Sequence, residues 1–226
     1  MTNPPDSPPG THVQGSWRIA NVSRTGSRHL RHGQVCEDSA GWFIDSELVA
    51  IAVADGAGSA PRSALGSAAA VRAAILAVMD RQWTLGAITL EVAPKVLSFA
   101  FESAAKALLA EAAAVGGVPD DFACTLIAVI AGRDFVAAAH VGDGAAVVCD
   151  STGHLFTLST PTNGAFANET ALLGCGQSWD VTVTTLASIG PKRLAALPWA
   201  PRCIQCQNAA DRGSTESPIE SLVNAA

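Results

Sequence analysis

Two helix-like segments stand side by side between two groups of short, β-prone runs, and this order limits the possible folds more than any other feature. Residues 61–81 carry apolar side chains at spacings of three and four, and a second such segment follows Thr89 and stops at Gly116-Gly117. The β-prone runs lie at 16–22, 41–44 and 48–54, and again at 122–131, 135–141, 145–149 and 154–158. This order predicts an α+β fold in which helices cover antiparallel sheets.

Each predicted segment also has its own start and stop signals. Ser59 is expected to cap the first helix, with Pro61 in its first turn. The two helices are expected to turn these side chains toward a sheet: Ala64, Ala68, Val71, Ile75 and Val78 in the first, and Val96, Leu97, Ala100, Phe101, Ala104 and Leu108 in the second. Turn residues separate the later strands, which predicts an antiparallel meander.

Composition excludes several classes of protein. The chain has 226 residues, of which 49% are hydrophobic, enough for one domain with a sizeable core. Its net charge is -6 and it has no long Lys/Arg cluster, so we expect no nucleic-acid partner. The continuous apolar runs at residues 48–54 and 122–131 are shorter than the roughly 20 residues that cross a bilayer. A Pro-rich start without a signal-peptide pattern and scattered cysteines predict a cytoplasmic monomer with free thiols and no membrane contact.

Three acidic segments lie beside predicted strand ends, at residues 36–38, 53–58 and 140–144. An Asp that ends an apolar run is held at the edge of a rigid sheet, and a following glycine lets the backbone approach a ligand. Clusters of oxygen ligands favour Mg²⁺ or Mn²⁺ over zinc. Glu37 and Asp38 point to opposite sides of an extended strand, so one could bind an ion while the other orients a metal-bound water. Each segment by itself also fits an ordinary turn.

Five segments, in this order, resemble the bacterial branch of the PPM-type serine/threonine protein phosphatases, over roughly residues 17–183. They are residues 26–29 with 36–39, 52–59, 122–126, 141–143 and 167–170. The resemblance implies an antiparallel β-sandwich flanked by helices in four layers (α-β-β-α), incomplete at its C-terminal end. It also implies hydrolysis of phosphoserine or phosphothreonine in a phosphorylated protein, with two Mg²⁺ or Mn²⁺ ions as cofactors.

The resemblance also implies a role for each acidic residue. Asp55 would bridge the two ions, Gly56 would contribute its carbonyl oxygen, and Glu37 would hold the second ion. Asp38 would hydrogen-bond a metal-bound water, and Asp143 matches the position that serves a weaker third ion in some members. Two close cations can activate a water and stabilise charge on phosphoryl oxygens, so the implied ligands agree with the oxygen-rich character of the segments.

Four cationic side chains stand just before Glu37, and they could help to bind the substrate phosphate. They are Arg28, His29, Arg31 and His32, of which His29 best matches the family position. A solvated polar loop is the open alternative for each of them. Some family members carry a His after the bridging Asp-Gly pair as general acid, whereas this chain has Ala57. Protonation of the leaving group would then fall to water or another group.

The last part of the chain departs from the family pattern. Two further metal-ligating Asp residues are expected late in the chain, but the carboxylates after Ala187 are Asp211, Glu216 and Glu220 in an unfavourable context. We therefore expect a disordered leader at 1–15, a phosphatase-like domain at 16–187, and an unmatched, poorly ordered tail at 188–226. A frame-shifted tail is one hypothesis, which the other reading frames of the encoding DNA would test. Cys203 and Cys206 have zinc or redox spacing, but a single such pair is a weak signal.

Three interpretations therefore stay open. The leading one is a metal-dependent phosphatase, with the activity of this chain unsettled. The second is a catalytically inactive PPM-like domain that regulates by binding a partner. The third is an unrelated Ala-rich interaction domain whose acidic turns are coincidental; it predicts no effect of Mn²⁺ on the melting temperature.

Overall fold

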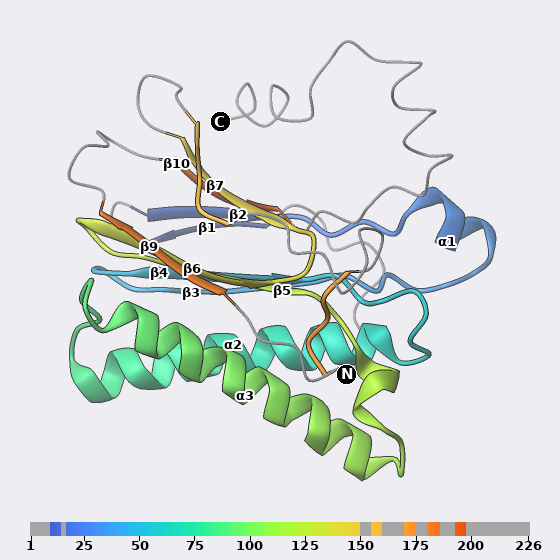
Figure 1. The fold of residues 1–226 in the computed structure, drawn as a ribbon. Helices are drawn as coiled ribbons and strands as arrows, with labels where there is room; N and C mark the ends of the chain where they lie inside the picture. Colours follow the sequence, from blue (N-terminus) through green and yellow to red (C-terminus); the bar gives the residue numbers. More distant parts are fainter. Residues whose placement is uncertain are drawn as a thin grey trace.

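A five-stranded antiparallel sheet forms the centre of the computed structural model (Figure 1). The structure describes residues 10–14, 17–149, 155–159, 170–174, 180–185 and 193–197. The strand order is β3-β4-β5-β6-β9, and every neighbouring pair is antiparallel. The bounds are Ser39–Ile44 for β3, Val49–Ala54 for β4, Leu126–Ala131 for β5, Phe135–Val141 for β6 and Asp180–Thr185 for β9.

Two long helices cover one face of this sheet (Figure 1): α2, Ser63–Leu85, and α3, Ala93–Ala114. In α3 the whole predicted apolar face is buried, as expected. In α2 the prediction is confirmed for Val71 and Val78, which are buried, and for Ile75, which packs against the core, whereas Ala64 and Ala68 are only half-buried. The buried side of the helix also includes Ser67, Ala70, Ala74 and Ala77. Because α2 is rich in alanine all round, its contacts with the sheet and α3, rather than periodicity, decide which face is buried.

The start of α2 also differs from the prediction. Ser59 does not cap it; the residue before the helix is Arg62, and no side chain caps this end. The Arg62 N–H donates instead to the Asp121 carbonyl, at 2.8 Å. Asp121 belongs to η1, Pro119–Phe122, a short 3₁₀ helix that also delays the start of β5 to Leu126, four residues later than expected.

A second, smaller set of strands lies on the side of the central sheet away from the helices (Figure 1). A three-stranded sheet has the order β10-β7-β8, and a hairpin is formed by β1 and β2. Their bounds are Ala145–Cys149 for β7, Leu155–Thr157 for β8, Arg193–Leu197 for β10, Gly10–Gln14 for β1 and Trp17–Asn21 for β2. Apolar residues of β2, β7 and the central sheet, such as Ile19, Val148 and Val129, form one buried cluster between the layers.

The predicted α+β sandwich with flanking helices is thus confirmed, with layers in the order helices, central sheet, second sheet. No helix covers the outer face of the second sheet in the part of the chain that is described. The expected meander divides at residues 142–144, since β6 belongs to the central sheet and β7 to the second. Strand β1 falls within the expected leader and β10 within the expected tail; most other residues of both segments, Cys203 and Cys206 included, lie outside the described residues.

By its length and apolar composition alone, helix α2 could cross a membrane, but half of its most apolar stretch is buried inside the fold. It packs on the central sheet and on α3, as the core helix of a folded domain does. Its apolar character is therefore accounted for by core packing.

Candidate active site

Four acidic side chains gather at the edge of the central sheet that is formed by the ends of its strands. Asp55 follows the end of β4, Asp143 follows the end of β6, and Glu37 and Asp38 precede the start of β3. Because β3, β4, β5 and β6 are consecutive antiparallel neighbours, the start of β3 and the ends of β4 and β6 all lie at the same edge. The structure therefore brings together all the acidic residues that the sequence analysis singled out.

Backbone hydrogen bonds hold Asp55 in place at the end of its strand. The Asp55 N–H donates to Thr125 Oγ1 at 2.9 Å, and the Thr125 N–H donates to the Asp55 carbonyl at 2.8 Å. Thr125 is itself buried, just before the start of β5. These two hydrogen bonds hold both backbone groups of Asp55, and they therefore fix the position from which its carboxylate extends.

Gly56 allows the segment that carries Glu37 to approach Asp55. A Cβ atom at Gly56 would lie 2.8 Å from both the Glu37 carbonyl oxygen and Ser63 Cβ, so a larger residue does not fit. The Gly56 N–H donates to the Glu37 carbonyl at 3.1 Å, and Ser67 Oγ donates to the same carbonyl at 2.6 Å. The sequence analysis missed Ser67; the available signal was a hydroxyl group within an Ala-rich helix face.

A second glycine positions Asp143. Gly142 has a φ of 119°, which disfavours side chains, and a Cβ there would lie 2.6 Å from the Thr125 side chain. Thr170 hydrogen-bonds the Asp143 carboxylate. The predicted segment 167–170 thus contributes its Thr to the site, while residues 167–169 lie outside the described residues.

The gathered carboxyl groups change one another's acidity. The pKa of Asp55 is raised from 3.8 to about 8, first by burial, then by the charge of Asp38, a hydrogen bond with the Asp38 side chain, and the charges of Asp143 and Glu37. Burial also raises the pKa of Asp143, against the hydrogen bonds from its own backbone and from Thr170. Like charges held this close favour either a retained proton or a bound cation.

Of the four cationic residues before Glu37, His29 reaches the cluster. It lies on the short helix α1, Ser27–Arg31, with its Nε2 atom 4.0 Å from Glu37 Oε2. Arg31 instead donates to the Ser27 carbonyl within α1, and His32 is exposed. The backbone of Arg28 belongs to α1, and its side chain lies outside the described part of the structure.

The chemistry of the donors fits a hard cation. Every ligand candidate around Asp55 is a carboxylate or carbonyl oxygen, which suits Mg²⁺ or Mn²⁺. Within the described ranges, however, no three His, Cys, Asp or Glu side chains are close enough together to form a ready-made metal site. A bound ion would therefore need to draw these side chains closer or to take water as further ligands.

The model of the family described as "Protein phosphatase 2C" matches residues 25–190 of this sequence. The chain belongs to the protein phosphatase 2C family. This confirms the resemblance to PPM-type phosphatases and excludes the interpretation of an unrelated Ala-rich domain. The family consists of metal-dependent protein serine/threonine phosphatases, and the four carboxylates stand in segments that the family model covers.

Among curated relatives of this phosphatase 2C chain is serine/threonine-protein phosphatase 3 of Escherichia coli (strain K12). The two are 33% identical over 164 residues, which are 69% of this chain and 62% of the E. coli protein. This chain thus spans a little under two thirds of the length of that relative.

Two solved structures show the same fold. Serine/threonine phosphatase Stp1 from Staphylococcus aureus has a TM-score of 0.58 at 17% identity, over 73% of this chain and 69% of Stp1. A bacterial serine phosphatase has a TM-score of 0.55 at 17% identity, over 67% of this chain and 68% of its own. At this identity the likeness supports the fold and not the details of the site.

Proposed function

We propose that this chain is a metal-dependent phosphatase that hydrolyses phosphoserine and phosphothreonine in proteins of the cytoplasm. The observation that carries the proposal is the gathering of Glu37, Asp38 and Asp143 around a largely buried Asp55 at one sheet edge. Burial first, and then the charges of these neighbours, raise the pKa of Asp55 to about 8. A fold that only needed a turn here would gain nothing from four mutually repelling carboxyl groups.

The oxygen atoms of Glu37, Asp55, Gly56 and Asp143 are the proposed ligands of Mg²⁺ or Mn²⁺. When bound, the cations would supply the positive charge that activates a water molecule and neutralises the phosphoryl oxygens. Asp55 must lose its proton to serve as a ligand, so cation binding and deprotonation of Asp55 are coupled.

Two further residues act on the substrate and on protons in this proposal. His29 lies beside Glu37 and, when protonated, can donate from a ring nitrogen to a phosphoryl oxygen. Asp38 already shares a hydrogen bond with the Asp55 carboxyl group, so its carboxylate can accept a proton from the attacking water. Asp38 is held at the sheet edge just before β3, and His29 is held on α1 beside Glu37, so both are positioned for these roles.

The first experiment compares Mn²⁺-dependent hydrolysis of para-nitrophenyl phosphate and of a phosphoserine peptide by the wild-type chain and by Asp55→Asn. The variant keeps the shape of the side chain but removes its charge, so we expect at least about a 100-fold loss of rate. Asp80→Asn is the matched control, because Asp80 is exposed on α2 and belongs to no part of the site. It should retain the wild-type rate.

Either contrary outcome is informative. Asp55→Asn with most of the wild-type activity would remove Asp55 from the proposed site. Equal, negligible rates in all three proteins would contradict the proposed activity and favour the catalytically inactive, partner-binding interpretation.

A further inference from the structure

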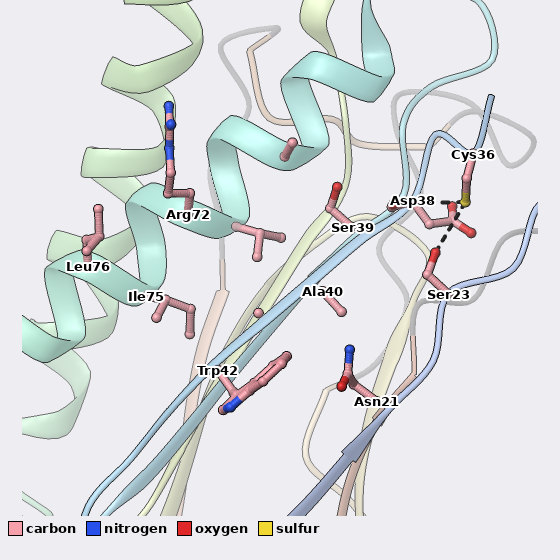
Figure 2. A pocket seen from close by; sticks show the side chains of 13 residues that line it. Asn21, Ser23, Cys36, Asp38, Ser39, Ala40, Trp42, Arg72, Ile75 and Leu76 are labelled. Carbon is pink, nitrogen blue, oxygen red and sulfur yellow. Dashed lines mark hydrogen bonds between the residues drawn. The ribbon is translucent and has the colours of Figure 1, made fainter. Parts of the chain in front are cut away.

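A cavity of about 400 Å³ runs along the outer edge of β3, next to the proposed active site (Figure 2). Asp38 belongs both to this cavity and to the carboxyl cluster around Asp55. Cys36, Asp38 and Ser23 form a polar end (Figure 2). Further along β3 the lining is apolar, with Trp42 on the side of the second sheet and Ile75 and Leu76 on the side of α2; we call this part the apolar end. We call this cavity the edge groove. It is within the volume range of ligand sites and begins where the phosphoryl group is proposed to bind.

The edge groove has one wall on each side of β3. Helix α2 provides one wall through Val71 and Ile75, and the end of β2 with the chain just after it provides the other through Asn21 and Ser23 (Figure 2). The helix wall is set close to the strand, because a Cβ atom at Gly41 would lie 2.7 Å from Val71 Cγ1. The groove therefore follows the direction of β3, which is at the edge of the central sheet. This shape fits an extended chain rather than a compact molecule.

An unsatisfied polar atom lies on the wall formed by the end of β2. The Oδ1 atom of Asn21 is buried and has no hydrogen-bond partner among the described residues. Ser23 Oγ, by contrast, is 3.2 Å from Cys36 Sγ. Buried amide oxygens are nearly always hydrogen-bonded, so a turn of the Asn21 side chain toward the groove would let its Oδ1 accept a hydrogen bond from a ligand or from water. A peptide backbone supplies N–H donors along its whole length.

We propose that the edge groove binds an extended substrate peptide and that its apolar end selects an apolar side chain four residues from the phosphorylated residue. Asp38, just before β3, and Trp42, within it, are four residues apart, which corresponds to about 13 Å of extended chain. A phosphorylated side chain at the carboxyl cluster would thus place such a residue against Trp42, Ile75 and Leu76. This inference rests on the proposed phosphatase function and adds its substrate class.

The test measures peptide binding by fluorescence anisotropy. The labelled peptides carry a non-hydrolysable phosphonate analogue of phosphoserine. In one series Leu or Ala stands four residues before the analogue, and in the other series it stands four residues after the analogue. Burial of a Leu side chain stabilises a complex by about 1.5 kcal/mol or more, so the Leu peptide of one series should bind about tenfold more tightly than its Ala counterpart. Equal affinity of Leu and Ala peptides in both series would overturn the inference.

Two variants of the groove separate recognition from general damage. Ala68→Phe should fill the groove, and Ile75→Glu should make its apolar end unfavourable; Ala68 and Ile75 are both half-buried lining residues. In either folded variant the preference for Leu should fall to less than about twofold. Leu109→Glu is the matched control, since Leu109 is an exposed apolar residue on α3 and does not line the groove. It should keep the tenfold preference, and an unchanged preference in both groove variants would contradict the proposal.

Binding of unphosphorylated Leu and Ala peptides, together with turnover of phosphopeptides, distinguishes a failure of this inference from a failure of the proposed function. The unphosphorylated peptides report on the groove alone. A preference for Leu that is lost in Ala68→Phe, in a protein without Mn²⁺-dependent turnover, would support the groove and contradict the phosphatase proposal. Turnover of phosphopeptides with no preference for Leu would support the phosphatase and overturn the groove.

Discussion

Asp55 carries the most specific chemistry of any single residue in this protein. Its backbone is fixed by the reciprocal pair of hydrogen bonds with Thr125, and Gly56 gives the Glu37 segment room to approach it. Burial, and after it the charges of the neighbouring carboxylates, raise the pKa of Asp55 to about 8. A carboxyl group kept in this state is a cost to the folded protein when no cation is present, and such local costs are common at functional sites.

The first prediction at this scale concerns pH. In the presence of EDTA, the free energy of unfolding should contain a part that falls as the pH rises from about 4 to about 8. Between these values folded Asp55 keeps a proton that the unfolded chain has released, because its pKa is about 8 in the fold against 3.8 ordinarily. The slope is therefore negative in this window and vanishes above it. Urea unfolding of the wild type and Asp55→Asn at several pH values measures this part as their difference.

Asp55→Asn should accordingly be more stable than the wild type at pH 8 and lose that advantage toward pH 4. Asp80→Asn, which removes an exposed charge, should follow the wild-type curve. A constant difference between the wild type and Asp55→Asn at every pH would show that Asp55 does not retain its proton in the fold.

At the scale of elements, the contact between α2 and η1 links the core to the site. Arg62 at the start of α2 is paired with Asp121 at 3.3 Å, and its guanidinium lies 5.7 Å from the centre of the Phe122 ring. One turn further, a Cβ atom at Gly66 would overlap the Phe122 carbonyl oxygen. The segment that leaves η1 then leads to Thr125, the residue that anchors Asp55. A displacement of η1 would therefore reach the proposed active site.

Gly66→Ala tests this linkage. In an exposed helix the change would stabilise by about 1 kcal/mol, but here overpacking against backbone should cost about 1–3 kcal/mol. We expect a net loss of stability together with weaker Mn²⁺ binding, measured by urea unfolding and by titration with Mn²⁺. Gly58→Ala is the control, because a Cβ atom at Gly58 meets nothing within 4 Å. A stabilised Gly66→Ala protein would show that α2 and η1 are not packed as tightly as described.

At the scale of the whole molecule, the site joins parts of the chain that are far apart in sequence. Glu37, Asp55 and Asp143 come from three separate segments, brought together by the pairing of β3 through β6. A cation shared by these segments would bind the folded chain and not the unfolded one. Its binding free energy would therefore add to the stability of the entire domain.

Mn²⁺ should raise the melting temperature of the wild type. At 100 times the dissociation constant the gain is about 2.7 kcal/mol, which corresponds to about 5–10 °C for a chain of this size. Asp55→Asn should show little or none of this rise, whereas Asp80→Asn should show all of it. An equal rise in all three proteins would place the Mn²⁺ site elsewhere, and no rise in any of them would argue against a cation site in the fold.

The sequence by itself determined the class of fold and the members of the acidic cluster. The strands β6 and β7 and the buried face of α3 follow their predicted positions, because periodicity and turn residues act over a few neighbours. Asp55 and Asp143 could be singled out since each follows a strand in a turn that contains glycine, a pattern visible in the local sequence.

Only the tertiary structure decided the features that depend on distant contacts. Alanine on every side of α2 leaves its buried face to packing against the sheet and α3. The meander divides at Gly142 because β6 and β7 pair with strands of different sheets. The hydrogen bond from Ser67 to the Glu37 carbonyl and the edge groove beside β3 likewise depend on residues that are far apart in the chain. Such contacts form only when whole elements come together, so no local pattern in the sequence specifies them.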